Sequence, residues 1–124
     1  MGDENIRKIA ERMRREDERD GRLLAKRRLA MQQEARRIAR VIGRADAEVK
    51  RVLLYGSLIP GRTITRQSDI DLLIDGGELS RALTAAEESE YPVDVLRVED
   101  LRPRIRDMVL ESAEVLYESQ NRQH

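Results

Sequence analysis

The sequence lacks cysteine altogether, and its single histidine is the last residue, His124. Disulfide bonds, thiolate metal sites and histidine-based catalysis are therefore excluded, and the absence of cysteine suits a reducing compartment. Phenylalanine and tryptophan are also absent, and only three tyrosines supply aromatic rings. A hydrophobic core built from this chain must therefore be aliphatic.

Long apolar runs are missing as well. No run approaches the length needed to cross a membrane, and the N-terminus lacks the basic-then-apolar order of a signal peptide. We therefore expect a soluble, cytoplasmic protein with no membrane association. A chain of 124 residues has room for one small domain with an extension.

The charges balance in number but are unevenly distributed. Residues 1–50 carry 15 basic and 10 acidic side chains, whereas residues 51–124 carry 9 and 14. Residues 22–44 are the most basic stretch, with eight Lys or Arg and only Glu34 opposing them. Such a stripe fits a solvated helix face, or a surface that meets phosphates or an acidic protein. Because stacking aromatic residues are scarce, direct nucleic-acid binding is not expected.

Residues 4 to about 43 have the composition of a helix, without proline. Its second half has an apolar stripe at helical spacing, formed by Leu24, Met31, Ala35, Ile38 and Ile42. The first half has a weaker stripe, and Gly21 interrupts it. We therefore divide the chain into a charged helical extension or arm, residues 1–21, and a domain, residues 22–124. The arm is expected to project, to break near Gly21 or to fray, and a homo-oligomer formed through this helix is an open alternative.

The second half of the chain alternates between strand and helix patterns. The expected elements are a strand at 49–55, a turn at 56–68, a strand at 69–74, a helix at 78–89, a strand at 92–98 and a final helix from Pro103 to Glu118. This order predicts an α+β fold, an α/β layer in which helices back a small, mixed, three-stranded sheet.

Acidic residues recur in the predicted strands. Asp69 and Asp71 are two positions apart, so they point to one face of a strand while Ile70 points to the other. Two carboxylates on one face are unfavourable together unless a cation lies between them. Asp94, in the third predicted strand, can converge on the same face. Each of these acids alone is more typical of an ordinary solvent-facing position.

Gly56 and Ser57 form a small-residue turn after the first predicted strand. A glycine lets the backbone approach a ligand closely, and a serine hydroxyl with nearby amides can bind a phosphate. Three carboxylates beside such a turn suit two divalent ions such as Mg²⁺, held about 4 Å apart. The combination predicts chemistry on a metal-bound nucleotide.

The series Gly56-Ser57, an eleven-residue spacer, Asp69-x-Asp71 and Val93-Asp94-Val95 resembles the DNA polymerase beta-like nucleotidyltransferase superfamily. The nearest branch is the minimal nucleotidyltransferases, which are often paired with HEPN-domain toxins. The resemblance covers about residues 24–118 and implies a nucleotidyltransferase-like fold behind the long N-terminal helical extension.

The resemblance also implies roles for the matching residues. The catalytic and metal-binding residues would be Asp69, Asp71 and Asp94, with the first two binding both Mg²⁺ ions. Asp94 would complete the catalytic metal site and help deprotonate the acceptor hydroxyl. The turn at 56–57 would hold the β- and γ-phosphates of ATP.

The reaction implied is transfer of a nucleoside monophosphate, expected to be AMP from ATP, to a hydroxyl with release of pyrophosphate. In toxin-linked members the acceptor is a tyrosine of the HEPN toxin, and the transferase acts as the antitoxin. A small-molecule nucleotidyltransferase of the aminoglycoside-modifying type is the less favoured enzyme, because this chain lacks the length for an added helical domain.

The sequence departs from the family after the Gly-Ser turn. Ile59-Pro60-Gly61 stands where the family commonly has Ala-Arg-Gly, and Arg62 follows. We expect Arg62 to bind the nucleotide phosphates in place of the missing arginine, with Arg66 as a second candidate. The departure leaves an alternative open, a catalytically weak or inactive protein of this fold that neutralises its partner by binding.

Overall fold

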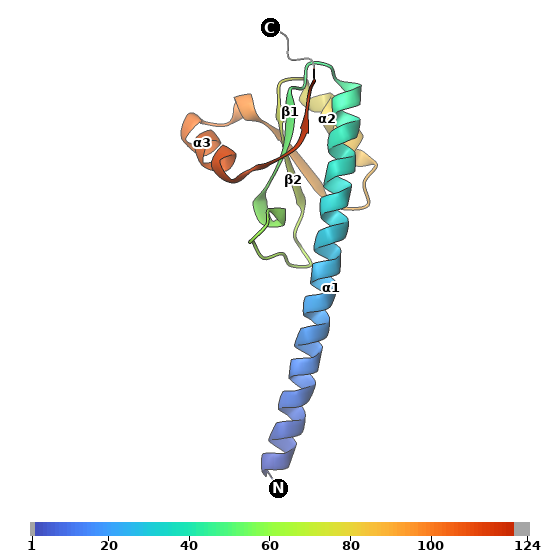
Figure 1. Cartoon of the computed structure of the whole chain (residues 1–124), viewed down its shortest axis with the longest axis vertical. Helices are drawn as coiled ribbons and strands as arrows, with labels where there is room; N and C mark the ends of the chain where they lie inside the picture. Colours follow the sequence, from blue (N-terminus) through green and yellow to red (C-terminus); the bar gives the residue numbers. More distant parts are fainter. Residues whose placement is uncertain (1, 121–124) are drawn as a thin grey trace.

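A computed structural model describes residues 2–120 (Figure 1). The elements follow the chain in this order: α1 (Gly2–Ala45), β1 (Arg51–Tyr55), the 3₁₀ turn η1 (Gly56–Leu58), β2 (Ile70–Asp75), α2 (Leu79–Glu87), β3 (Val93–Arg97), the 3₁₀ turn η2 (Val98–Asp100), α3 (Pro103–Ser112) and β4 (Glu114–Glu118). The bounds of β1, β2, α2 and β3 fall within two residues of those expected from the sequence.

The four strands form one mixed sheet in the order β3-β2-β1-β4. The central strand β1 pairs antiparallel with both β2 and β4, whereas β2 and β3 are parallel and are joined by α2. Parallel neighbours need such a crossover, because a short hairpin can join only antiparallel strands. The sheet brings the end of β1, the start of β2 and the start of β3 to one edge.

Helices cover the two faces of the sheet unequally. The larger core lies under α1 and α2, where Met31 and Ile38 pack with Leu54, Leu72 and other buried aliphatic residues. On the opposite face α3 covers a smaller cluster built on Leu53 and Leu73. Because α3 covers only part of its face, the end of the sheet near η1 stays partly open there.

The prediction that the last helix continues to Glu118 is wrong, and the sheet has four strands rather than three. The helix α3 ends at Ser112, and Ala113 is already extended with ψ 148°. Residues 114–118 then pair with β1 along an edge whose backbone groups would otherwise lack partners. The Tyr117 ring lies where a methyl group on Gly43 of α1 would stand. That contact requires glycine in the helix and fixes the new strand against it.

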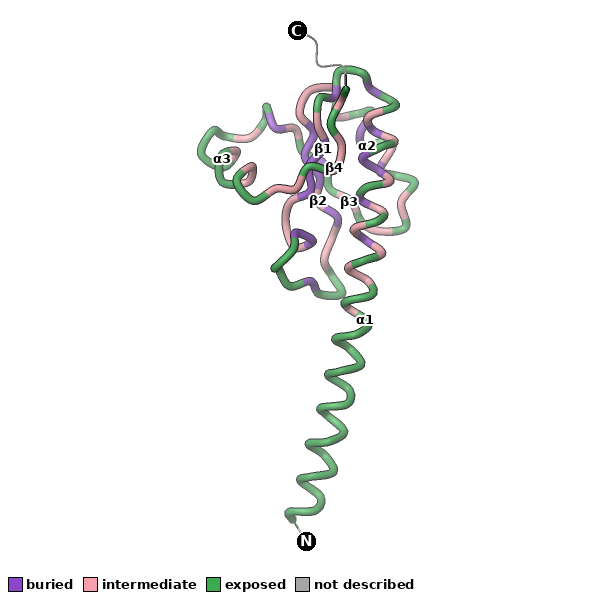
Figure 2. Tube along the Cα trace, in the orientation of Figure 1, coloured by how far each residue is buried: buried purple, intermediate pink, exposed green. Residues whose placement is uncertain are grey.

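The helix α1 runs without a break through Gly21, so of the three behaviours expected for the arm, projection is confirmed. All residues from 2 to 23 are exposed, and Leu24 is the first that packs on the body (Figure 2). One glycine in a helix costs about 1 kcal/mol relative to alanine. Opposite charges at i,i+4 spacing offset this cost. They occur at Asp3/Arg7, Glu4/Lys8, Glu11/Arg15 and Glu18/Arg22.

Among the described residues, no helix has both the length and the apolar character needed to span a membrane.

Candidate functional site

Three polar side chains form a row across the sheet at its η1 end. Tyr55 of β1 is the register partner of Asp71 of β2, and Asp71 is the register partner of Asp94 of β3. Leu73 lies two residues after Asp71 and packs under α3, so alternation puts Asp71 on the α3 side of the sheet. Register partners share a face, so the sequence-based expectation that Asp71 and Asp94 point the same way agrees with the strand pairing.

Asp69 lies one residue before β2 and is half-buried. It joins the row electrostatically, because its charge contributes to raising the pKa of Asp71. The turn that leads into it is ordered by side-chain hydrogen bonds, in which the Thr65 amide donates to Ser68 Oγ at 2.9 Å and the Gln67 amide donates to Thr65 Oγ1 at 3.1 Å. Asp71 and Asp94 therefore share one face of the sheet, and Asp69 lies near enough for its charge to act on Asp71.

The row carries negative charge without a compensating cation. Burial, and then the charges of Asp94 and Asp69, raise the pKa of Asp71 to about 6. Burial, and then the charges of Asp71 and Asp94, raise the pKa of Tyr55 to about 12. Within residues 2–120, none of the three carboxylates forms an ion pair with a lysine or arginine. Such a site favours a bound cation.

The carboxylates fit a divalent ion by type but are not gathered into a closed cage. Hard oxygen ligands are those that Mg²⁺ prefers. Yet in the described part of the chain, no three His, Cys, Asp or Glu side chains are arranged so that they alone could hold a metal ion. An ion at this site would therefore need further oxygen ligands, and Mg²⁺ commonly takes these from water and substrate phosphates.

Gly56 makes room for Asp71. The glycine begins η1 with a φ of +79°, a conformation that residues with a side chain rarely adopt. A methyl group at this position would overlap Asp71 Oδ2. The group that the Gly56 backbone approaches closely is the carboxylate of Asp71, one of the predicted metal ligands, and the expected approach to a phosphate stays a prediction. Ser57 follows directly and is half-buried.

Two side chains of α1 hold the loop that contains η1. Arg28 Nη1 donates to the carbonyl oxygens of residues 57, 58 and 59 at 3.3, 3.3 and 3.4 Å, and Arg28 Nη2 donates to the carbonyl of Arg62. Gln32 Nε2 donates to the Leu58 carbonyl at 2.9 Å. Neither residue was predicted from the sequence. The available signal was a polar pair, Arg28 and Gln32, on the side of the helix between Leu24 and Ala35.

The two candidate phosphate-binding arginines differ in their surroundings. Arg62 is exposed, its amide donates to the Ile59 carbonyl at 3.1 Å, and its own carbonyl accepts from Arg28. Arg66 pairs with Asp20 of the projecting helix, with 3.6 Å between Arg66 Nη2 and Asp20 Oδ1. The contact of Arg66 turns it toward α1, so Arg62 remains the better candidate for a phosphate.

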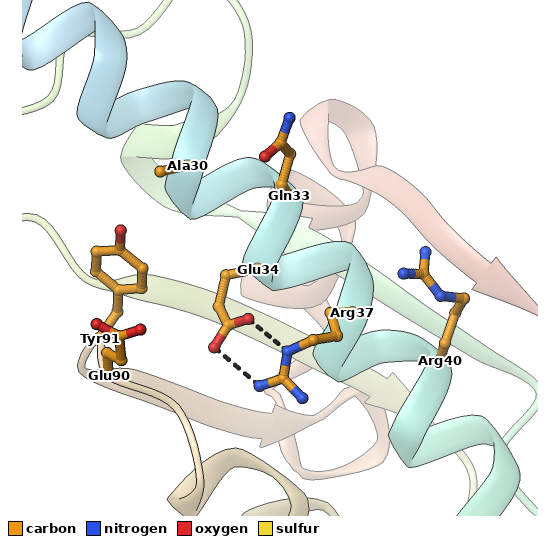
Figure 3. A pocket seen from close by; sticks show the side chains of 7 residues that line it. All are labelled: Ala30, Gln33, Glu34, Arg37, Arg40, Glu90 and Tyr91. Atoms are coloured by element: carbon orange, nitrogen blue, oxygen red, sulfur yellow. Dashed lines mark hydrogen bonds and ion pairs between the residues drawn. The ribbon is translucent and has the colours of Figure 1, made fainter.

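A hollow of about 390 Å³ lies elsewhere, between α1 and the residues before β3 (Figure 3). The carboxylate of Glu34, which lines it, already has partners. Glu34 accepts two hydrogen bonds from Arg37, at 2.5 and 2.9 Å, and one from Ser89 at 2.7 Å. The bonds from Arg37 hold the pKa of Glu34 below its usual value. Arg27 stacks on the Tyr91 ring at 5.3 Å from its centre. We interpret this hollow as part of helix packing rather than as a site.

No protein-family model matches the sequence, and a search of curated proteins gives no match. Solved structures do match. One, described as a crystal structure of a toxin–antitoxin with AMP-PNP, has a TM-score of 0.57 and 19% identity, over 69% of this chain and 74% of that chain. Another, a mutant of the toxin–antitoxin MntA-HpeT, has a TM-score of 0.56 and 16% identity over the same shares. At these identities the likeness concerns the fold.

The fold comparison agrees with the expected class, a mixed α+β architecture in which helices cover a mixed sheet. The MntA-HpeT mutant replaces two aspartates, two positions apart, with glutamates. Asp69 and Asp71 have the same spacing in this chain.

Proposed function

We propose that this chain is a metal-dependent nucleotidyltransferase that acts as the antitoxin of a toxin–antitoxin pair. It would transfer AMP from ATP to a hydroxyl of its partner and release pyrophosphate. The observation that carries the proposal is the row of Asp71 and Asp94 in adjacent strands, with Asp69 beside it, at the end of the sheet where Gly56 and Ser57 turn. The nucleotidyltransferase-like fold, found in a toxin–antitoxin crystallised with AMP-PNP, supports it.

In this proposal each side chain has a role that suits its surroundings. Asp69 and Asp71 would provide oxygen ligands between the sheet and the triphosphate. Asp94 is exposed, so an incoming hydroxyl can reach it and give up its proton there. Ser57 and the backbone at Gly56 would bind the terminal phosphates, with Arg62 neutralising their charge. When bound, Mg²⁺ supplies phosphate neutralisation and a lowered pKa for the attacking hydroxyl.

The acceptor in the proposal is a tyrosine of a HEPN-type toxin. The chain is short, and the body beyond the arm is little more than the sheet and its covering helices (Figure 1). Among residues 2–120, this body leaves little room for a separate pocket that binds a small acceptor. A partner that brings its own hydroxyl to the exposed side of Asp94 resolves this difficulty.

The test is incubation of the purified chain with ATP, Mg²⁺ and the protein encoded beside it, followed by intact-mass measurement of both proteins. The proposal expects the partner to gain the mass of AMP, and the Asp71→Asn variant to transfer none. Asp107→Asn, an exposed substitution on α3, is the matched control and should transfer normally. Absence of added mass with the unmodified chain would contradict the proposal.

A second candidate is a protein of the same fold that neutralises the toxin by contact alone. Pro60, in the place of the family's arginine, and the open arrangement of the carboxylates favour it. The two candidates differ in one outcome. If Asp71→Asn still neutralises the partner in growing cells, contact is sufficient, whereas loss of neutralisation with retained complex formation favours catalysis.

A further inference from the structure

The projecting part of α1 comprises residues 2–23, so it ends two residues later than the arm predicted from the sequence. From here on, the arm means residues 2–23. It leaves the body at the end of the sheet where β1 ends and β2 begins (Figure 1). The contact of Arg66 with Asp20 and those of Arg28 with the 56–62 loop confirm that this end of the body lies beside the start of the arm. The candidate site and the arm therefore occupy the same end of the molecule.

The outer arm carries an exposed apolar stripe. Ile6, Ile9 and Met13 are 65%, 46% and 58% exposed, and Ala10 is exposed between them. Their spacing, i, i+3, i+4 and i+7, is the anchor pattern of an amphipathic helix that binds in an apolar groove. Three large apolar side chains gathered on an otherwise charged helix are a candidate contact surface.

The stripe faces the same way as the buried face of the helix. Ile6 lies 18 residues before Leu24, and Met13 lies 18 residues before the fully buried Met31. Eighteen residues make about five turns at 3.6 residues each, so the members of each pair point in the same direction. A protein bound to the stripe would therefore lie on the side of the arm that faces the space beyond the 56–66 loop.

The charges around the stripe define the kind of surface that fits it. Residues 5–15 contain five basic side chains and one acidic one, Glu11. Helical geometry puts Arg7, Arg12 and Arg14 at the borders of the stripe, whereas Glu11 lies nearly opposite its centre. A groove with apolar walls and an acidic rim is complementary to this arrangement.

A second copy of the chain fits the stripe less well. Two arms packed in parallel would bring their basic segments, residues 5–15, into contact, whereas antiparallel arms would place these segments against the acidic side chains of residues 16–20. Three large apolar side chains per arm would also bury well below the roughly 1,200 Å² of a stable interface. The small area therefore disfavours a homodimer through this surface, and like charge disfavours it further when the arms are parallel.

We infer that the arm binds an apolar, acid-rimmed groove on the partner protein and thereby holds that partner beside the candidate site. The inference rests on the proposed function in one respect, namely that the partner is held there because the partner supplies the acceptor hydroxyl.

The test measures the affinity of the full chain for the protein encoded beside it, by calorimetry at two salt concentrations. The double variant Ile6→Glu/Met13→Glu is expected to raise the dissociation constant by about tenfold or more, since buried apolar anchors dominate such contacts. Arg7→Glu/Arg14→Glu is expected to weaken binding mainly at low salt. Leu23→Glu is the matched control, because Leu23 is exposed on the same helix but lies off the stripe, and its affinity should not change.

Binding of ATP by each variant in Mg²⁺ separates this inference from the proposed function. The inference is supported if the arm variants no longer bind the partner but bind ATP normally. It is also supported if the unmodified chain binds the partner but no ATP, and the arm variants no longer bind the partner. The inference is overturned if the unmodified chain forms no complex, or if the double variant binds as well as the unmodified chain. Sedimentation of the chain alone is the remaining check. If Ile6→Glu/Met13→Glu dissociates a homodimer, the stripe binds a second copy of the chain and the inference is overturned.

Discussion

Asp71 is the residue whose surroundings conflict most with its own charge. It is partly buried beside two other carboxylates, which raises its pKa to about 6, and the adjacent backbone position tolerates only glycine. Folded proteins tolerate such conflicts where they serve function. In the proposed function, this unfavourable charge would contribute to the binding energy of a Mg²⁺ ion.

The charge of Asp71 should make stability depend on pH in a metal-free buffer. Its pKa is higher in the folded state than the 3.8 expected when unfolded, so the folded state binds more protons between about pH 4 and 6 and stability falls as the pH rises through that window. Asp71→Asn removes the charge. Urea denaturation should find the variant more stable than the unmodified chain by on the order of 1–2 kcal/mol at pH 7.5, a value reduced for partial exposure, and nearly equal to it at pH 4.

The control for this experiment is Asp107→Asn, which changes an exposed carboxylate on α3 and should have no effect at either pH. Equal stability of Asp71→Asn and the unmodified chain at pH 7.5 would mean that the carboxylates do not repel one another as the strand pairing suggests.

Gly56 and Gly61 form a matched pair for substitution. Both have a positive φ, +79° and +88°, but only a methyl group at Gly56 meets another atom, Asp71 Oδ2. Gly61→Ala should therefore pay only the backbone cost, about 1 kcal/mol. Gly56→Ala should lower the free energy of unfolding by at least about 1 kcal/mol more. Denaturant titration of both variants checks this, and equal losses would mean that the turn does not press against Asp71.

At the residue level, the sequence was informative where alternation along a strand decides the geometry. The prediction that Asp71 and Asp94 share a face agrees with the pairing of β2 and β3, whereas Asp69 lies before β2, where alternation does not decide its direction. Arg28 could not be found in this way. Its partners are about 30 positions away in the sequence, and no local pattern encodes which loop a helical side chain will meet.

At the level of elements, the loop from 56 to 66 depends on α1. Four carbonyl groups accept hydrogen bonds from the single guanidinium of Arg28, a fork of donors that lysine cannot reproduce. Arg28 therefore links the long helix to the turn that approaches Asp71. A displacement of Arg28 would break its hydrogen bonds to this loop and so alter the turn beside Asp71.

Arg28→Lys should loosen this loop while the fold remains. Amide hydrogen exchange in residues 56–66 is expected to accelerate at least about fivefold, which corresponds to the loss of about 1 kcal/mol of local hydrogen bonding. Lys26→Ala, at a neighbouring exposed position, is the control and should leave exchange in the loop unchanged. Unaltered exchange in Arg28→Lys would show that the loop is ordered by its own turns.

The element that sequence patterns predicted wrongly is β4. Apolar residues from Ile105 to Leu116 fit a helical spacing, which favoured one continuous helix. The decisive fact is a tertiary one, since β1 has a free edge that residues 114–118 can pair with. The strands β2 and β3 were easier to predict from the sequence. For β2 the reason is that it is buried on both faces, so residues 72–74 form a continuous apolar run.

At the level of the whole molecule, the chain consists of a small body and a long arm that meet beside the candidate site (Figure 2). From the length of the helix and its weak apolar stripe, the sequence favoured either projection or disorder of this segment. It did not predict that the stripe and the site would lie at the same end of the body, because that depends on the direction in which α1 crosses the sheet. This shared end is the reason to connect the arm with the chemistry.

The most direct measurement for the central claim is calorimetric titration of the unmodified chain and of Asp71→Asn with AMP-PNP at pH 7.5, with Mg²⁺ and again with a chelator. We predict binding that requires Mg²⁺ and that weakens by about tenfold or more in Asp71→Asn, as expected when a ligand to a metal is removed. Equal affinities with and without Mg²⁺, or equal affinities for the two proteins, would contradict a metal–nucleotide site at these carboxylates.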